Sequence, residues 1–168
     1  MCTYWSEQSE FAPDTPAAPQ VVVVRLEPDT FDQVEPALTW HFESFASRTL
    51  GAEGGDDFRA AIRQGLWQCW VVSIEGSIRA VALTHVTSCG APMVEITHCA
   101  GQGRADWQSP LMDGIEAWAA EIGAHQIRAT ARPGWRGFLY QRTYRVTHLV
   151  MERPVRPPTL SSVFREGG

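Results

Sequence analysis

Two glycines that precede an amphipathic helix form the segment of the chain best suited to bind a ligand. Gly101 and Gly103 follow a strand-like stretch, and a helical pattern begins near Trp107 or Gln108. Glycines at such a point let several backbone N–H groups turn toward one anion, and the helix dipole adds positive potential. Arg104 can add a charged hydrogen bond. A pyrophosphate fits this pattern, although an ordinary glycine turn explains the two glycines equally simply.

Most other reactive residue types lack the spacing that would indicate a known chemistry. His85 and His98 lie on neighbouring predicted strands near Cys89 and Cys99, but no CxxC or HxxxH pattern accompanies them, so we expect no metal site. A nucleophilic Cys99 activated by His98 is also disfavoured, because adjacent strand residues point to opposite faces.

Composition excludes several classes of protein. The chain has 168 residues, 44% of them hydrophobic, which is enough for one domain with a core of its own. Its net charge of −5, without a basic run, argues against nucleic acid as the main partner. No apolar run has the length of a membrane span, and the N-terminus does not have the pattern of a signal peptide. The positions of the cysteines show no paired spacing. We therefore expect a cytoplasmic protein.

The hydrophobic periodicity predicts the elements that would position this loop. The predicted strands cover 21–26, 69–74, 78–87, 93–99, 127–131 and 147–153, and the predicted helices begin near Asp29, near Asp56, at 108 and at 135. Leu111, Ile115, Trp118 and Ile122 mark the clearest helix, which Gly123 ends. Pro36 must lie in the first turn of the first helix or kink it. Residues 1–20 are predicted to be a flexible arm and residues 154–168 a tail.

The predicted order, β-α-α-β-β-β-α-β-α-β, describes an α+β domain over residues 21–153 with a mixed sheet and helices on both faces. We expect the strands at 93–99 and 127–131 to be parallel and to splay apart near Ala100.

This order resembles the GNAT superfamily of acyl-CoA-dependent N-acyltransferases. The resemblance is sharpest in the second half, in a glycine loop leading to Trp107, a helix with Glu116 and Trp118, and the turn Arg132–Trp135, followed by Tyr144. The ordered set is similar to GNAT-like proteins carried by phages and prophages. It implies a GNAT fold that binds acetyl-CoA or CoA, with cofactor contacts from the following residues: Cys99, Ala100, Gly101, Gln102, Gly103, Arg104 and Trp107.

The resemblance also implies where acetyl transfer to an amine would occur. The thioester would lie beside the strand at 93–99, which makes Glu95 the first candidate for the general base. Tyr140 or Tyr144 is the candidate general acid, and Trp40 and His41 are candidates for the wall of the acceptor pocket. Glu95 and His98 face opposite sides of an unbroken strand, and a bulge would change that.

The loop departs from the usual family pattern in two ways. In the usual loop, R/Q-x-x-G-x-G/A, two residues separate the first position from the glycine, whereas here Gly103 follows Gln102 directly. Asp106 also places a negative charge near the proposed phosphates unless it caps the helix or pairs with Arg104. The family tyrosine would fall near Leu139, one residue from Tyr140.

The function that the resemblance implies is an acetyl-CoA-dependent N-acetyltransferase acting on an amine of a small molecule or protein. The alternatives are a catalytically degenerate phage protein that binds a host protein, in the host cytoplasm, and a virion or assembly component.

Overall fold

The computed structural model describes residues 19–48 and 53–148. Within them lie five strands: β1 (Val21–Leu26), β2 (Trp67–Ile74), β3 (Ser77–Cys89), β4 (Ala91–Gly101) and β5 (Gln126–Ala129). They form one sheet in the order β1-β2-β3-β4-β5, in which the first four strands are antiparallel and β5 is parallel to β4. The predicted parallel pairing of these two segments is confirmed.

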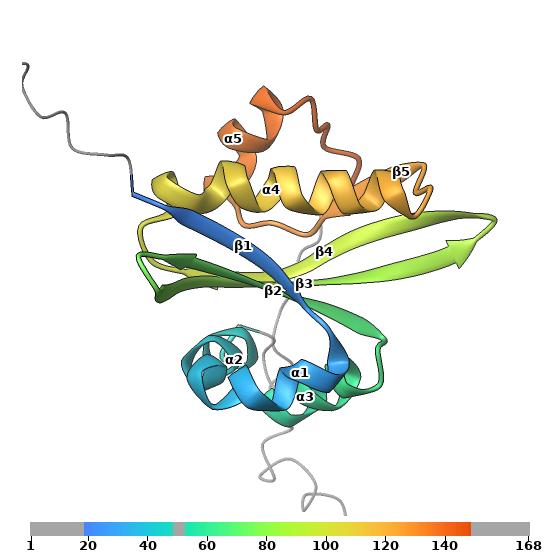
Figure 1. The fold of residues 1–168 in the computed structure, drawn as a ribbon. Helices are drawn as coiled ribbons and strands as arrows, with labels where there is room; N and C mark the ends of the chain where they lie inside the picture. The colour runs from blue at the N-terminus through green and yellow to red at the C-terminus, as the bar shows by residue number, and fades with distance from the viewer. Residues whose placement is uncertain (1–18, 49–52, 149–168) are drawn as a thin grey trace, which may run out of the picture.

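Helices cover both faces of the sheet (Figure 1). On one face lie α1 (Pro28–Val34), the 3-10 helix η1 (Glu35–Leu38), α2 (Thr39–Ala46) and α3 (Gly55–Arg63). On the other lie α4 (Arg104–Glu121) and α5 (Arg136–Gln141), the latter preceded by the 3-10 helix η2 (Pro133–Trp135). The predicted fold class, a mixed α+β sheet between helices, is confirmed. No helix in the described part of the chain is long and apolar enough to cross a membrane.

Each face of the sheet has its own hydrophobic cluster. The α1–α3 side is built around four interlocking phenylalanines, Phe31, Phe42, Phe45 and Phe58, each at most 1% exposed. The α4 side is built around Trp70, Trp107, Leu111, Met112 and Ile115. Burial of apolar area at about 25 cal/mol per Å² makes these two clusters the main source of stability.

The observed elements differ from the predicted ones at several ends. The first predicted helix is divided into α1, η1 and α2, and the break falls at Pro36, which has no N–H to continue a helix. The helix α4 begins at Arg104, four residues earlier than predicted, and β5 ends at Ala129 instead of residue 131. Thr147 and His148 are not in a strand. The rest of the predicted strand at 147–153, most of the arm at 1–20 and the tail at 154–168 lie outside the described residues.

A bulge interrupts β4 next to the glycine loop. Leu83 of β3 is opposite His98, but the next residue, Thr84, is opposite Ile96, so Thr97 is an extra residue on β4. An extra residue reverses the alternation of side chains along the strand. As a result, Glu95 and His98 lie on the same face of the sheet, the one that carries α1–α3. This corrects the expectation for an unbroken strand.

The pairing of β4 with β5 ends before β4 does. The last paired residues are Ile96 and Ala129, and the Thr130 N–H still donates to the Ile96 carbonyl at 2.9 Å. Residues 97–101 of β4 continue without β5 beside them. This agrees with the predicted separation of the two strands near Ala100, and it leaves one edge of β4 accessible at the N-terminus of α4.

Candidate active site

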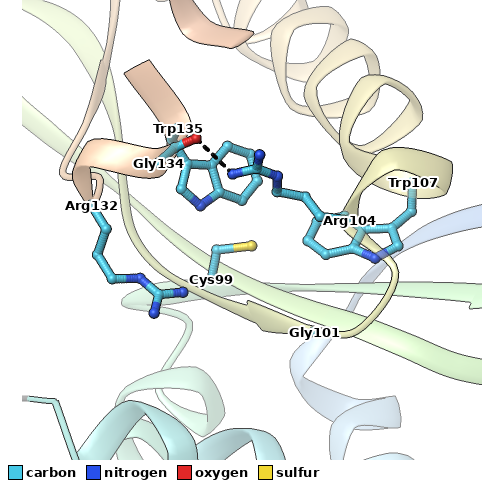
Figure 2. A pocket seen from close by; sticks show the side chains of 7 residues that line it. All are labelled: Cys99, Gly101, Arg104, Trp107, Arg132, Gly134 and Trp135. Carbon is cyan, nitrogen blue, oxygen red and sulfur yellow. Dashed lines mark hydrogen bonds between the residues drawn. The ribbon is translucent and has the colours of Figure 1, made fainter. Parts of the chain in front are cut away.

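A cleft of about 270 Å³ lies where the two strands separate (Figure 2). Its lining combines residues from the end of β4, the start of α4 and the segment after β5: Cys99, Gly101, Arg104, Trp107, Arg132, Gly134 and Trp135. Four of these, Cys99, Gly101, Arg104 and Trp107, belong to the loop that the sequence analysis selected. The other three belong to the Arg132–Trp135 turn.

The two glycines of the loop each have a local structural reason. Gly103 has φ of +65° at the N-cap of α4, a conformation that costs other residues about 1 kcal/mol or more. A Cβ on Gly101 would lie 2.5 Å from the Arg79 carbonyl oxygen and 2.6 Å from the Ala80 Cβ. Gly101 is therefore required for close packing of β4 on β3, and Gly103 for the turn into α4.

The remaining loop residues hold this turn in place. The Trp107 indole, 1% exposed, donates from Nε1 to the Gln102 carbonyl at 2.7 Å. Its ring lies 6.0 Å from that of Trp135. Ala100 is buried on the opposite face, in the cluster under α1–α3. The loop thus contributes Gly101 to the cleft, and Trp107 both lines the cleft and anchors the loop.

Arg104 is held at the mouth of the cleft by the Arg132–Trp135 turn. Its Nη1 donates to the Gly134 carbonyl at 2.8 Å, and its guanidinium lies 5.2 Å from the centre of the Trp135 ring. Within the described residues Asp106 neither caps α4 with its side chain nor pairs with Arg104. The helix N-terminus and Arg104 therefore supply positive potential, and Asp106 opposes it in the first turn.

Two further arginines near the cleft are not among the residues predicted from the sequence. Arg132 lines the cleft, and Arg48, two residues past the end of α2, donates from Nη1 to the Cys99 carbonyl at 3.4 Å. Burial raises the pKa of the Cys99 thiol to about 12, against the opposing effect of Arg132, Arg48 and Arg104. Cys99 is therefore a neutral thiol in the wall of a positively charged cleft. Arg132 lies in the RPGW motif, whereas nothing in the sequence near Arg48 indicates a site.

Glu95 is one member of a row of side chains that crosses the sheet in register. Trp67 on β2 is opposite His85 on β3, His85 is opposite Glu95 on β4, and Glu95 is opposite Arg128 on β5. The Glu95 carboxylate lies 3.7 Å from His85 Nε2 and 3.9 Å from Arg128 Nη1. The Thr130 hydroxyl also donates to it at 3.3 Å. Partners on β3, on β5 and just after β5 therefore hold the Glu95 side chain in place.

His98 lies on the same face as this row because of the bulge at Thr97. Its ring stacks on Trp67 at 5.6 Å and contacts the rings of Phe45 and Phe58. Its Nε2 is 3.7 Å from Glu53, yet burial lowers the pKa of His98, which favours the neutral imidazole. His98 therefore contributes mainly to the aromatic wall next to β4.

The two predicted acceptor-pocket residues are on α2, in the layer that covers this face. Trp40 is 48% exposed, and its ring packs edge-on against His41 at 4.8 Å. His41 is 6% exposed, and burial lowers its pKa. Trp40 thus presents an aromatic surface to solvent, and His41 belongs to the packing beneath it.

The two candidate tyrosines lie on the opposite side, near α5. Both line a second cleft, of about 500 Å³, with Thr143, Arg145 and Val146. The Tyr140 hydroxyl accepts from Arg136 Nε at 3.2 Å, and the Tyr144 hydroxyl donates to Glu116 at 3.4 Å. Burial, followed by the charge of Glu116, raises the pKa of Tyr144. Neither tyrosine is among the residues that line the first cleft.

No protein-family model matches the sequence, and no curated protein matches it. Solved structures do resemble the fold. An aminoglycoside acetyltransferase from an uncultured soil metagenomic sample is 18% identical, with a TM-score of 0.60 over 82% of this chain and 99% of its own. Glucosamine-6-phosphate N-acetyltransferase from Arabidopsis thaliana is 10% identical, with a TM-score of 0.60 over 82% and 99%.

A third similar structure is a predicted acetyltransferase from Clostridium acetobutylicum, with acetyl-CoA, which is 13% identical with a TM-score of 0.58 over 80% and 96% of the two chains. At these identities the likeness is one of fold. The chain therefore has the mixed α+β fold of the GNAT acetyltransferases.

Proposed function

We propose that this protein binds acetyl-CoA in the cleft between β4 and β5 and transfers its acetyl group to an amine. The observation that carries the proposal is the accessible edge of β4 beyond Ile96, which begins at a bulge and ends at the N-terminus of an 18-residue helix. A long helix presents unpaired N–H groups and a positive dipole end at this point. The arrangement suits a ligand with an extended amide-containing arm and a pyrophosphate.

The charges of the cleft support this choice of cofactor. Arg104, fixed by Gly134 and Trp135, lies where it can contact phosphate oxygens beside the α4 N-terminus. Among proteins of the same fold, the structure from Clostridium acetobutylicum is one with acetyl-CoA. The Asp106 carboxylate reduces the attraction, so we expect binding to be weaker than in a loop without it.

Glu95 is the proposed general base. The attacking amine must be neutral, so one proton passes from the acceptor ammonium to the Glu95 carboxylate, directly or through water. The amine nitrogen then forms a bond to the acetyl carbonyl carbon, the C–S bond breaks, and the electron pair leaves with the sulfur of CoA. The nitrogen loses its second proton to water as the neutral amide forms. Backbone N–H groups along the accessible edge of β4 can stabilise the negative charge that develops on the carbonyl oxygen.

The departing thiolate needs a proton, and of the two tyrosines, which both line the second cleft, Tyr140 is the one that we propose to supply it. Tyr144 is tied to Glu116 and is half-buried, whereas Tyr140 is 45% exposed and has the Arg136 guanidinium beside its hydroxyl. The acceptor is an amine on a small molecule or a protein. It would enter on the face that carries Glu95, Trp40 and the α2 layer.

Acetyl-CoA binding tests the proposal directly. At a hundredfold excess over the dissociation constant, the ligand should stabilise the fold by about 2.7 kcal/mol, visible as a rise in melting temperature of roughly 5–10 °C. The Arg104→Gln variant should bind acetyl-CoA more weakly in calorimetry, while Arg63→Gln, which removes an equal charge on α3, should bind normally. The absence of heat and of a melting shift at millimolar acetyl-CoA would exclude the proposal.

Turnover separates the enzyme from a binding module of the same fold. Release of free CoA thiol in the presence of a panel of amines would show acetyl transfer. Binding of acetyl-CoA without CoA release for any amine would instead favour the non-catalytic alternative, in which the cleft is retained and the chemistry is lost.

A further inference from the structure

Three arginines surround Glu95 and the accessible edge of β4. Arg128 on β5 is opposite Glu95 on β4, and Arg132, which lines the cleft, lies four residues after Arg128 in the chain. Arg48 approaches from the end of α2 and contacts the Cys99 carbonyl. All three residues are exposed as whole residues, although the guanidinium of Arg48 is partly desolvated.

Arg48 and Arg132 both lie beside Cys99, since Arg48 contacts its carbonyl and Arg132 lines the same cleft. Burial, followed by the positive charge of Arg132, lowers the pKa of Arg48. In the part of the chain that the structure describes, the nearby carboxylates Glu95 and Glu53 pair with His85, Arg128 and His98, and no ion pair includes Arg48 or Arg132. Two like charges without a carboxylate between them form a site that a bound anion would stabilise.

The direction of Arg132 separates this pair from the proposed cofactor phosphates. In Figure 2 the Arg104 side chain extends toward Gly134 and Trp135, whereas the Arg132 guanidinium points away from both, past Cys99. Arg48 follows directly after α2, the helix that carries Trp40, and reaches β4 at the Cys99 carbonyl. Arg48 is therefore on the acceptor side of the cleft, Arg104 is on the side of the α4 N-terminus, and Arg132 lines the cleft with its guanidinium turned away from Gly134 and Trp135.

We propose that the acceptor carries an anionic group, a carboxylate or a phosphate, close to the amine that is acetylated, and that Arg48 and Arg132 bind this group. The inference rests on the proposed acetyl transfer and names the substrate class of that site. Guanidinium groups bind carboxylate and phosphate oxygens in paired hydrogen bonds. Glu95 would contact the amine end of the same molecule. The protein carboxylate would then face the substrate amine, and the two guanidinium groups would face the substrate anion.

This charge pattern disfavours polycationic acceptors. An aminoglycoside would place several ammonium groups among three arginines, and like charges brought together without a counter-ion raise the free energy of the complex. Fold likeness to aminoglycoside acetyltransferases therefore does not extend to the acceptor. We expect amino acids or phosphorylated amino sugars to be better substrates than neutral or polycationic amines.

Matched pairs of acceptors provide the test. Glucosamine 6-phosphate is compared with glucosamine, and alanine with alaninamide, and sisomicin serves as the polycationic amine; CoA release is measured for each. For at least one pair the anionic member should have a kcat/KM at least tenfold higher. In Arg48→Gln and Arg132→Gln that advantage should fall about tenfold, mainly through KM, and in Arg48→Gln, whose residue does not line the cofactor cleft, acetyl-CoA affinity should stay unchanged. The Arg63→Gln control should keep it.

Each other result contradicts the inference in a distinct way. Equal or better turnover of the neutral or polycationic members would overturn it, as would acetyl-CoA binding without turnover of any anionic amine. If Arg48→Gln weakens acetyl-CoA binding and leaves the preference among acceptors unchanged, the anion belongs to the cofactor. Failure of the wild-type protein to bind acetyl-CoA would count against the proposed function itself. The comparison of acceptors uses wild-type protein, so it holds even if a variant fails to fold.

Discussion

Glu95 is the residue whose surroundings most resemble those of a catalytic group. It lies between His85 and Arg128 in one cross-strand row and accepts from Thr130, and its side chain is 18% exposed. These contacts fix the carboxylate at the point where β4 becomes accessible. Glu95 is either a general base or a carboxylate that only pairs with its neighbours. Only a general base would affect kcat, so kinetics distinguish the two roles.

We predict that Glu95→Gln lowers kcat by about 10²-fold or more, because the amide cannot accept a proton from the acceptor. Acetyl-CoA affinity and the melting temperature should change little, since glutamine retains the size of the side chain. Steady-state kinetics and calorimetry check both parts, with Glu121→Gln at the far end of α4 as the matched control. A fully active Glu95→Gln protein would reduce Glu95 to a structural strand residue.

Gly101 offers a second test at the residue scale. We predict that Gly101→Ala destabilises the fold by about 1–3 kcal/mol, because its Cβ would meet the Arg79 carbonyl oxygen and Ala80 at 2.5–2.6 Å. The control is Gly134→Ala in the same cleft, where the nearest atom would be Arg104 Nη1 at 3.8 Å. Urea denaturation compares the two variants. Equal stability would mean that β4 shifts away from β3 without cost.

At the scale of elements, Arg142 joins α5 to α4. It donates to Glu116 from Nε at 3.1 Å and from Nη2 at 2.6 Å, and it also contacts Asp113. The hydrogen bond to Glu116 is the largest of the effects that raise the pKa of Arg142. The α5 helix has six residues and is too short to be stable alone, so this contact and the packing of Phe138 hold it in place.

We predict that Arg142→Gln costs about 1–2 kcal/mol of stability and loosens α5, because the Glu116 carboxylate loses its charged partner. Amide hydrogen exchange should then be faster in residues 136–141 than in the core of α4. The control is Arg136→Gln, which removes a cation from the exposed face of the same helix. Unchanged exchange in α5 would show that aromatic packing alone fixes it.

Local patterns were sufficient to predict most elements of this fold. The β-branched run at Val21–Leu26 and the i, i+4 spacing in α4 depend only on neighbours in the sequence, and both elements are found. The start of α4 was predicted four residues too late, because Arg104, Ala105 and Asp106 follow a left-handed glycine and precede the first residue of the apolar repeat, Trp107. Pro36 correctly marked a break, where the chain forms the 3-10 helix η1.

The parts of the site that could not be predicted depend on contacts between distant segments. The bulge at Thr97 is a register shift between β3 and β4. The residues around Thr97 carry no local pattern that predicts a shift opposite Leu83 and Thr84. Arg48 and Arg132 are 84 positions apart in the chain and meet only because α2 ends beside β4. The glycine loop was found because its own residue types suggest an anion.

At the scale of the whole molecule, the two hydrophobic clusters pack on opposite faces of the same sheet. The site lies on that sheet, so its residues also contribute to the stability of the whole fold. Trp67, His98, Phe45 and Phe58 form one continuous aromatic contact from the acceptor face into the core beneath α2 and α3. His41 also lies in this layer, 6% exposed. Protonating either imidazole would place a charge among buried rings, which is unfavourable.

This coupling predicts that stability falls when the pH is lowered below about 6.5. Burial lowers the pKa of both His41 and His98 in the folded protein, so between the folded and unfolded pKa values the unfolded chain binds more protons. The free energy of unfolding should therefore decrease with falling pH, by up to about 1.4 kcal/mol per pH unit for each histidine. Urea denaturation from pH 8 to pH 5 measures this slope. His41→Gln and His98→Gln should each flatten it, whereas His125→Gln, at an exposed position, should not. A wild-type slope that survives both substitutions would assign the pH dependence to groups outside this layer.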